Sequence, residues 1–201
     1  MRLLELKVKL GFSQARKDLS NKDLSHYKLA KAKLENANLQ GANLSNTDLS
    51  DANLKGADLS YANLDNTDLR GAIVEGTDLR NVENVKTAKL GIDLSGINMS
   101  ELDLGNLDFT DCDFCNANLS KANLSNTTFD SAILENTNLS HANLSNSFLV
   151  GASLIEANMS YTNLSGADLF QANLADANLE NAQIENTNFE DANLEDTLGL
   201  K

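Results

Sequence analysis

A five-residue pattern repeats along almost the whole of this chain. Residues 35–70 contain seven copies in which a small residue is followed by Asn or Asp, then by Leu, and then by two polar residues. We call the Leu position the centre, and it holds a large apolar residue at nearly every fifth position from Leu19 to Leu194. The small position, two residues before each centre, is mostly Ala or Thr. Each repeat therefore has two apolar and three polar positions.

A five-residue period excludes the two simplest regular structures. In an α-helix, five residues turn through about 500°, so successive centres would fall about 140° out of phase. In a flat strand, side chains alternate, and an odd period would place successive centres on opposite faces. The pattern is satisfied if the chain turns by about 90° once per repeat and returns above itself after about 20 residues, with stacked coils about 4.8 Å apart.

The A-[DN]-L-x-x phrase closely resembles the pentapeptide-repeat family, and the resemblance covers about residues 17–197. It implies an all-β fold, a right-handed quadrilateral parallel β-helix known as the pentapeptide-repeat β-solenoid. The 36 centre positions between 19 and 194 correspond to about nine coils of this kind. We therefore expect a solenoid over 17–197, an N-terminal cap segment over 1–16 and a short C-terminal tail over 198–201.

The composition suits a stack of coils better than a compact globule. The chain has no Pro and no Trp, and only 5% of its residues are aromatic. A solenoid needs to bury only a thin column of side chains in each coil. The cap must cover the first coil, and apolar residues alternate with polar ones from Leu4 to Phe12. This alternation predicts a strand-like cap, whereas members of the family often begin with a short helix.

The pattern fails at two centre positions, which hold Asn84 and Lys89. A polar side chain aimed into an apolar column costs several kcal/mol unless it finds partners, so we expect an irregular break at about 82–91 with Leu90 pointing inward in place of Lys89. The phase is the same on both sides, which predicts a net insertion of zero or a multiple of five. The break is either a repaired packing defect or a displayed loop. Its candidate residues are Val82, Glu83, Asn84, Val85, Lys86, Thr87 and Lys89.

The sequence offers no arrangement typical of catalysis, metal binding or cofactor binding. Its two histidines, His26 and His141, both lie two places after a centre and far apart in the stack. Cys112 takes an inward position and Cys115 an outward one, so their CxxC spacing does not predict a redox or metal site. The many Asp and Asn residues are expected to bond nearby backbone in the turns. We expect no catalytic, metal-binding or cofactor-binding residues, and no enzyme.

Charge is distributed unevenly along the chain. Residues 1–33 hold nine Lys or Arg and three Asp or Glu, whereas residues 34–201 hold seven and 26. This acidity argues against nucleic acid or an anionic membrane as a direct partner. Some relatives in the resembled family mimic DNA and bind DNA gyrase, and the acidic surface fits that role as an alternative function. The other interpretation is that the charge keeps the stack soluble.

Several apolar residues occupy positions that are polar elsewhere in the repeat. With 20 residues in each coil, they fall on neighbouring faces of two or three coils, and we call them the apolar patch. Its members are Phe148, Val150, Phe170, Ile133 and Ile155. Exposed apolar residues that cluster in this way mark interaction sites, so we predict a protein partner, or a homodimer formed through the C-terminal half or end of the chain.

A third class of function is binding to an ordered surface such as ice. One vertical column holds Asn46, Asn66, Asn106, Asn126, Asn146 and Asn186. Asn ladders also stabilise stacked coils by themselves, and "MRLLELKVKL" mixes charge into its apolar positions, unlike an export signal. The sequence therefore predicts a cytoplasmic, non-catalytic rigid scaffold for protein–protein interaction, with DNA mimicry as the alternative.

Overall fold

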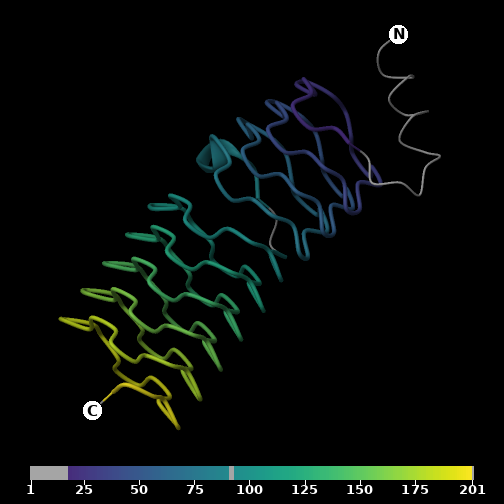
Figure 1. Ribbon diagram of the computed structural model, residues 1–201. Coiled ribbons are helices and arrows are strands. Elements are labelled where there is room, and N and C mark those ends of the chain that lie inside the picture. The colour runs from purple at the N-terminus through teal and green to yellow at the C-terminus, as the bar shows by residue number, and fades with distance from the viewer. Residues whose placement is uncertain (1–17, 91–92, 201) are drawn as a thin grey trace. The chain divides into compact units, whose positions relative to one another are not determined.

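The computed structural model describes residues 18–90 and 93–200. The chain divides into two compact units, Met1–Asp93 and Leu94–Lys201, which we call the N-terminal unit and the C-terminal unit. Within each unit the backbone winds in successive stacked coils (Figure 1). The predicted cap segment lies outside the described residues.

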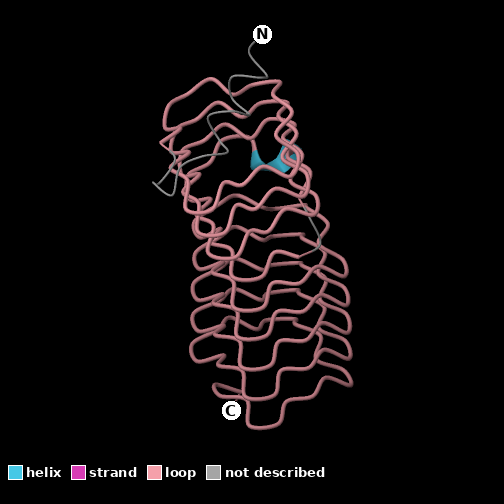
Figure 2. Ribbon diagram, turned by 90° about the vertical axis from the view of Figure 1, so that its right-hand side faces the viewer, coloured by secondary structure: helices cyan, strands magenta, loops and turns pink. Residues whose placement is uncertain are grey.

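Within each unit, parallel β-bridges join successive coils at a spacing of 20 residues, as in Asn118↔Asn138 and Asn138↔Asn158. In the regular repeats the bridging residue stands directly before a centre, and four such residues occur in each coil. The bridges form four ladders, one for each side of the coil. The only helix in the described residues is the 3₁₀ helix η1, Val85–Thr87 (Figure 2), and no extended strand is formed there. Among the described residues, no helix is long and apolar enough to cross a membrane.

Each corner of the coil is a tight turn that begins at a centre. Leu144 illustrates it: its carbonyl accepts a hydrogen bond of 3.1 Å from the N–H of Ser147, three residues later. The residue between them, Asn146, has a φ of 55°. A positive φ at the third residue of a hydrogen-bonded turn is characteristic of type II. The same position has a positive φ in repeat after repeat, which explains why Asn, Asp and Gly are frequent there.

In a repeat with Asn or Asp before the centre, all five backbone N–H groups can be satisfied. Two of them donate to the following coil, one donates to the preceding coil, one closes the turn, and one donates to a side chain. For repeat 39–43 the bonds are Leu39 N–H to Asp58 O (2.7 Å), Gln40 N–H to Asn38 Oδ1 (3.1 Å), Gly41 N–H to Ser60 O (2.9 Å), Ala42 N–H to Leu39 O (2.9 Å) and Asn43 N–H to Lys22 O (2.9 Å).

This pattern explains why the residue before the centre is so often Asn or Asp. Its side-chain oxygen accepts the N–H two residues later, which no backbone carbonyl reaches. Asn138 accepts from the N–H of Ser140 in this way at 3.1 Å. Backbone groups left without partners are costly, so this position favours a short side chain that carries an acceptor.

The centres and the small positions form the core. Leu144 and Ala142 are 0% and 1% exposed. In the C-terminal unit four centres are aromatic, and the rings of three of them, Phe109, Phe114 and Phe129, pack with centroids 5.1–5.8 Å apart. Where the small position is Thr, its hydroxyl donates to the preceding coil, so burial leaves no unpaired hydroxyl there.

The break in the pattern is an insertion that is compensated a few residues later. Lys89 bridges to Asp68, 21 residues earlier rather than 20, and the next bridging residue, Asp93, follows after only four residues. One residue is therefore gained and one is lost, which leaves the phase unchanged. Asn84 adopts a φ of 60° and its side chain is exposed, while Val85 is buried at 5% exposure. Lys89 is exposed, and the half-buried Leu90 follows it.

Candidate interaction surface

The four ladders give the C-terminal unit two different sides. What we call the acidic–apolar side consists of two adjacent ladders and the turns that follow them. These ladders are Asp108–Thr128–Phe148–Asp168–Asn188 and Asp113–Ile133–Ser153–Asn173–Asn193. What we call the amide side consists of the other two ladders and their turns. These are Asn98–Asn118–Asn138–Asn158–Asn178–Leu198 and Asp103–Asn123–Asn143–Asn163–Gln183.

All five residues of the apolar patch lie on the acidic–apolar side. Phe148 is 49% exposed and Ile133 is 39% exposed, while Val150, Phe170 and Ile155 are half-buried. Phe148 belongs to one ladder and Ile133 to the next. Val150 and Phe170 occupy the same turn position in consecutive coils, between these two ladders, and the N–H of Gly151 donates to the carbonyl of Phe170 at 2.9 Å. The coil therefore places Phe148, Val150, Phe170 and Ile133 around one corner, with Ile155 at the next corner of the same side.

Phe148 replaces the Asn or Asp that normally accepts the N–H two residues later. The N–H of Val150 instead donates to Oδ1 of Asp130, one coil earlier, at 3.0 Å. The backbone next to Phe148 therefore keeps its partner, and the carboxylate of Asp130 is fixed beside the patch.

Carboxylates are concentrated on the same side as the patch. Of the 16 Asp and Glu residues after position 93, twelve belong to the acidic–apolar side and four to the amide side. The twelve are Asp108, Asp111, Asp113, Asp130, Glu135, Glu156, Asp168, Asp176, Glu190, Asp191, Glu195 and Asp196. Among residues 94–200, Lys121 is the single Lys or Arg, and it pairs with Glu101 at 3.0 Å on the amide side. The acidic–apolar side is therefore uniformly negative in its ionisable groups.

The amide side uses many of its polar groups internally. Its asparagines bond along the ladder, with Asn143 Nδ2 donating to Asn123 Oδ1 at 3.3 Å and Asn163 Nδ2 to Asn143 Oδ1 at 3.2 Å. Two aromatic residues in its turns, His141 and Tyr161, stack with ring centroids 4.8 Å apart. The histidine thus packs against a neighbouring coil.

The column of asparagines lies at the corners of the coils. It is the column that was considered above for binding to an ordered surface such as ice. Asn46, Asn126 and Asn146 have φ values of 55–56° and occupy the third residue of the turn. Asn is frequent there because it tolerates the left-handed conformation. The column therefore has a structural reason that involves no ligand.

The predicted irregular loop belongs to the N-terminal unit and presents charge to solvent. Lys86 lies in η1, and both Lys86 and Lys89 are exposed. Asn84 Nδ2 donates to Asn63 Oδ1 at 2.9 Å, which ties the start of the loop to the coil before it. Of the predicted loop residues, Val82 and Val85 are buried and contribute to the core.

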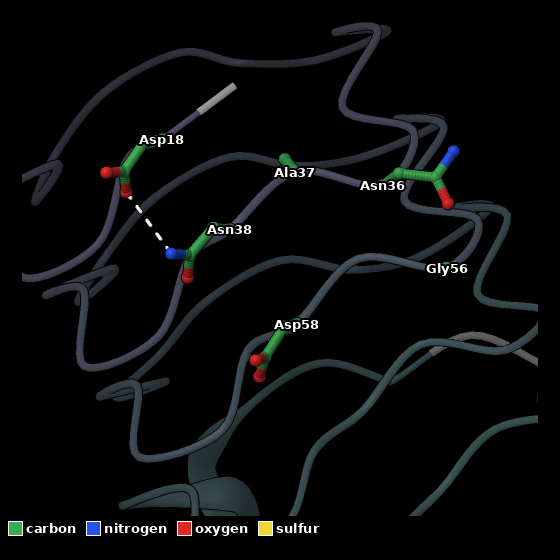
Figure 3. Close-up of a pocket in the computed structure, with 6 residues that line it drawn as sticks. All are labelled: Asp18, Asn36, Ala37, Asn38, Gly56 and Asp58. Carbon is green, nitrogen blue, oxygen red and sulfur yellow. Dashed lines mark hydrogen bonds between the residues drawn. The ribbon is translucent and has the colours of Figure 1, made fainter. Parts of the chain in front are cut away.

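A shallow pocket of about 300 Å³ lies in the N-terminal unit (Figure 3). Three of its lining residues, Asp18, Asn38 and Asp58, are successive members of one ladder, and Asn38 Nδ2 donates to Asp18 Oδ1 at 3.3 Å. The hydroxyl and the N–H of Ser20 hold the pKa of Asp18 below its usual value. In the described part of the chain, no group of three or more His, Cys, Asp or Glu residues is arranged to hold a metal ion.

The two cysteines lie in an environment that suppresses their reactivity. Cys112 is buried and Cys115 is half-buried, and both are free thiols. Burial, together with Asp108 and Asp111, raises the pKa of Cys112 to about 11. Burial and Asp113 raise the pKa of Cys115 to about 11 as well. Because the thiolate is the nucleophile, neither thiol is activated.

We expect iodoacetamide at pH 8 to alkylate both cysteines at least about tenfold more slowly in the folded chain than in urea, because their raised pKa values leave little thiolate at that pH. Mass spectrometry of quenched samples measures both rates, with glutathione as the reference thiol. Alkylation of the folded chain as fast as that of glutathione would contradict the raised pKa values.

Sequence reasoning identified the patch and the acidity separately but did not place them on one side. The signal was available, because residues 20 apart share a column, and sorting the carboxylates by column separates the two sides. The left-handed turn position was also missed, although its enrichment in Asn, Asp and Gly is visible in the sequence.

Comparison with known proteins supports the fold described above. The family model for pentapeptide repeats matches residues 18–56, 47–83, 92–130, 132–171 and 162–197. No curated protein matches the chain significantly in sequence.

Several solved structures resemble the chain. HetL from the cyanobacterium Nostoc sp. strain PCC 7120, described as a pentapeptide repeat protein involved in heterocyst differentiation regulation, is 25% identical, with 97% of this chain and 92% of that chain covered and a TM-score of 0.45. Rfr23 from the cyanobacterium Cyanothece 51142 is 29% identical over 53% of this chain and 90% of that chain, with a TM-score of 0.42. QnrB1, a plasmid-mediated fluoroquinolone resistance protein, is 18% identical over 90% and 91%, with a TM-score of 0.47. Because the family model matches most of its length, the chain belongs to the pentapeptide repeat family.

Proposed function

We propose that the protein is a non-catalytic, rigid scaffold for protein–protein interaction, and that the acidic–apolar side of its C-terminal unit is the surface that binds a partner. The observation that carries this proposal is the coincidence of the apolar patch with twelve of the 16 carboxylates on one side. Apolar residues in the middle of a contact surface, surrounded by polar ones, are typical of protein interfaces. We further infer a right-handed solenoid of about nine coils and a cytoplasmic setting.

The scaffold is suited to this role because its backbone is hydrogen-bonded from coil to coil. A surface held in this way loses little conformational entropy when a partner binds. The amide side differs, since its side chains bond to one another along the ladders. Binding is therefore expected on one side of the coil.

Photo-crosslinking tests the proposal with a matched pair of positions. Phe170 and Ser145 both follow a centre directly, but Phe170 lies on the acidic–apolar side and Ser145 on the amide side. We expect benzoylphenylalanine at position 170 to crosslink a specific protein in cells that produce the chain, and the same group at position 145 to crosslink none. Phe148→Asp in the background of the position 170 probe is expected to abolish the adduct, because a charge disrupts an apolar contact.

Equal crosslinking from both positions, or none from position 170, would contradict the proposed surface. The mass of the adduct identifies the class of partner. An adduct of twice the 21.7 kDa chain indicates a second copy, and any other mass indicates a different protein.

The charge of the C-terminal unit favours DNA mimicry as a second candidate function. Leu94–Lys201 holds 16 Asp or Glu and two Lys, a net of −14. Dense negative charge is the property that DNA-binding proteins recognise in the phosphate backbone. Under this candidate, binding depends on the carboxylates and tolerates Phe148→Ser, whereas the scaffold proposal requires the aromatic patch as well.

A further inference from the structure

We propose that one corner of the acidic–apolar side binds an extended, basic segment of another protein, in which an apolar residue lies between two Lys or Arg residues. This inference rests on the proposed function and names the chemical class of the partner. The corner is the one between the ladder that contains Phe148 and the ladder that contains Ile133. We call it the bracketed corner, because carboxylates lie before and after its apolar residues along the stack.

The first turn position of the bracketed corner holds apolar residues between acidic ones. Val150 and Phe170 take this position in consecutive coils. One coil before Val150 the same position holds Asp130. One coil after Phe170 it holds the exposed Glu190, which the exposed Asp191 follows directly. Two apolar residues are therefore enclosed between carboxylates in a single column of the stack.

The spacing of this column indicates the form of the segment that fits it. Asp130 and Glu190 are three coils apart, which corresponds to about 14 Å at the usual spacing of stacked coils. In an extended chain, side chains on one face are about 6.6 Å apart, so the first, third and fifth residues span about 13 Å. The third residue then lies opposite Val150 and Phe170. An α-helix repeats one face after about 10.5 or 16.5 Å, which matches the column less well.

Apolar side chains flank the column in both ladders. Phe148 lies two residues before Val150 and is 49% exposed, and Ile133 lies three residues after Asp130 and is 39% exposed. An apolar residue of the partner would therefore contact apolar atoms from both sides of the corner. Aromatic contacts of this kind supply much of the affinity of protein interfaces, and opposite charges around them set specificity.

Two carboxylates at the bracketed corner are oriented by hydrogen bonds within the protein. Asp130 accepts from the N–H of Val150 at 3.0 Å. Asp168, in the ladder next to the corner, accepts from the N–H of Phe170 at 3.1 Å and from the side-chain amide of Asn188 at 2.8 Å. Because the two oxygens of a carboxylate together accept several hydrogen bonds, each side chain retains acceptor capacity for a Lys or Arg of the partner.

Among residues 94–200, no Lys or Arg lies at the bracketed corner. The single cation of this range is Lys121, which pairs with Glu101 on the amide side at 3.0 Å. The negative charge of the corner is therefore available to a partner. A metal ion would use the carboxylates alone, whereas a polypeptide offers cations and an apolar side chain together, as the composition of the corner requires.

Binding of short fluorescent peptides to the full chain tests the proposal. Lys-Ser-Phe-Ser-Lys presents its three large side chains on one face when extended. Lys-Phe-Ser-Ser-Lys has the same composition and the same distance between its lysines, but it turns its ring to the other face. Both peptides carry blocked termini. Fluorescence anisotropy is measured at up to about 1 mM chain in 50 mM and in 500 mM salt, because screening at high salt weakens contacts between exposed charges.

We expect the first peptide to bind saturably at 50 mM salt and to bind more weakly at 500 mM salt. We expect the second peptide to bind at least about fivefold more weakly than the first, since its ring cannot reach the apolar residues while both lysines are engaged.

Two variants of equal charge locate the acidic part of the contact. Asp130→Asn/Glu190→Gln removes two charges from the bracketed corner and keeps the oxygen that accepts the N–H of Val150. We expect it to weaken binding of the first peptide at least about tenfold. Glu180→Gln/Glu185→Gln removes two charges from the amide side of the same unit and is the matched control, which we expect to bind like the wild type.

The apolar contribution is tested by Phe170→Ser, which leaves the charge unchanged. We expect this variant to bind the two peptides equally weakly, because the ring of the first peptide then loses its contact. Circular dichroism checks that the variant is folded. Phe148→Ser, at a more exposed position of the same corner, provides the same test if the half-buried Phe170 proves necessary for folding.

Three outcomes would overturn the proposal: no binding of Lys-Ser-Phe-Ser-Lys at the highest chain concentration, equal binding of the two peptides to the wild type, or equal losses in the two variants of equal charge. These outcomes are distinct from failure of the proposed function. A crosslink from position 170 to a second copy, or to a protein segment without two flanking Lys or Arg residues, would keep the binding surface and reject the basic segment as its occupant.

Discussion

Phe129→Ala is expected to lower the free energy of unfolding by about 3–5 kcal/mol. The ring of Phe129 is 0% exposed and packs against Phe109 at 5.5 Å and Phe114 at 5.8 Å between centroids. Removing it leaves a cavity in the column, and the backbone cannot collapse into that cavity because each coil is bonded to the coils on both sides. Urea unfolding followed by circular dichroism measures the change.

Phe148→Ala is the matched control for this prediction. The substitution is chemically the same, but Phe148 is 49% exposed and its ladder position faces outward. We expect it to cost less than about 1 kcal/mol, as surface substitutions usually do. Equal losses for the two variants would show that the aromatic core does not dominate the stability of this unit.

Gly166→Ala is expected to destabilise the C-terminal unit by about 2–3 kcal/mol for two separate reasons. Gly166 has a φ of 71°, a conformation that costs a residue with a Cβ about 1–2 kcal/mol. A Cβ at this position would also lie 2.6 Å from Oδ1 of Asn146 in the coil before it. The Asn146 side chain would have to leave its rotamer, which adds about 0.5–1.5 kcal/mol.

Gly151→Ala separates the two contributions. Gly151 has a similar φ of 65°, but a Cβ there would meet no atom within 4 Å. We expect this variant to lose only the conformational part, about 1–2 kcal/mol. Adding Asn146→Gly to Gly166→Ala removes the obstructing side chain and is expected to bring the loss down to that of Gly151→Ala. Thermal or urea unfolding of the four chains makes the comparison. Identical losses for Gly166→Ala and Gly151→Ala would exclude the steric contribution.

The sequence by itself determined the architecture of the coil. A five-residue period suits neither a helix nor a strand, so it requires one turn per repeat and a return after 20 residues, as the bridge Asn118↔Asn138 shows. The inward direction of the centre and of the small position followed from the same period, as did the family. The prediction of four sides was direct because each repeat is a local unit that contacts only its neighbours in the stack.

The tertiary structure decided what depends on the exact backbone and on columns that are distant in sequence. The break was visible in the sequence as Asn84 and Lys89, but its form was not. One residue is inserted between the bridging residues 83 and 89, and one is missing between 89 and 93, so the total number of residues does not change. The insertion is recognised only from the bridge between Asp68 and Lys89, which spans 21 residues. The carboxylate of Asp130 and the N–H of Val150 are 20 residues apart, and only the stacking of coils brings them to 3.0 Å.

The candidate surface was half predictable for the same reason. The residues of the apolar patch could be named from single positions, because an apolar residue in a polar position is a local signal. That these residues share one side with the carboxylates could not be seen from single positions, because the side is formed by two neighbouring ladders together. Local period determines the fold of a repeat protein, whereas the surface on which it acts depends on which distant residues the stacking of coils places side by side.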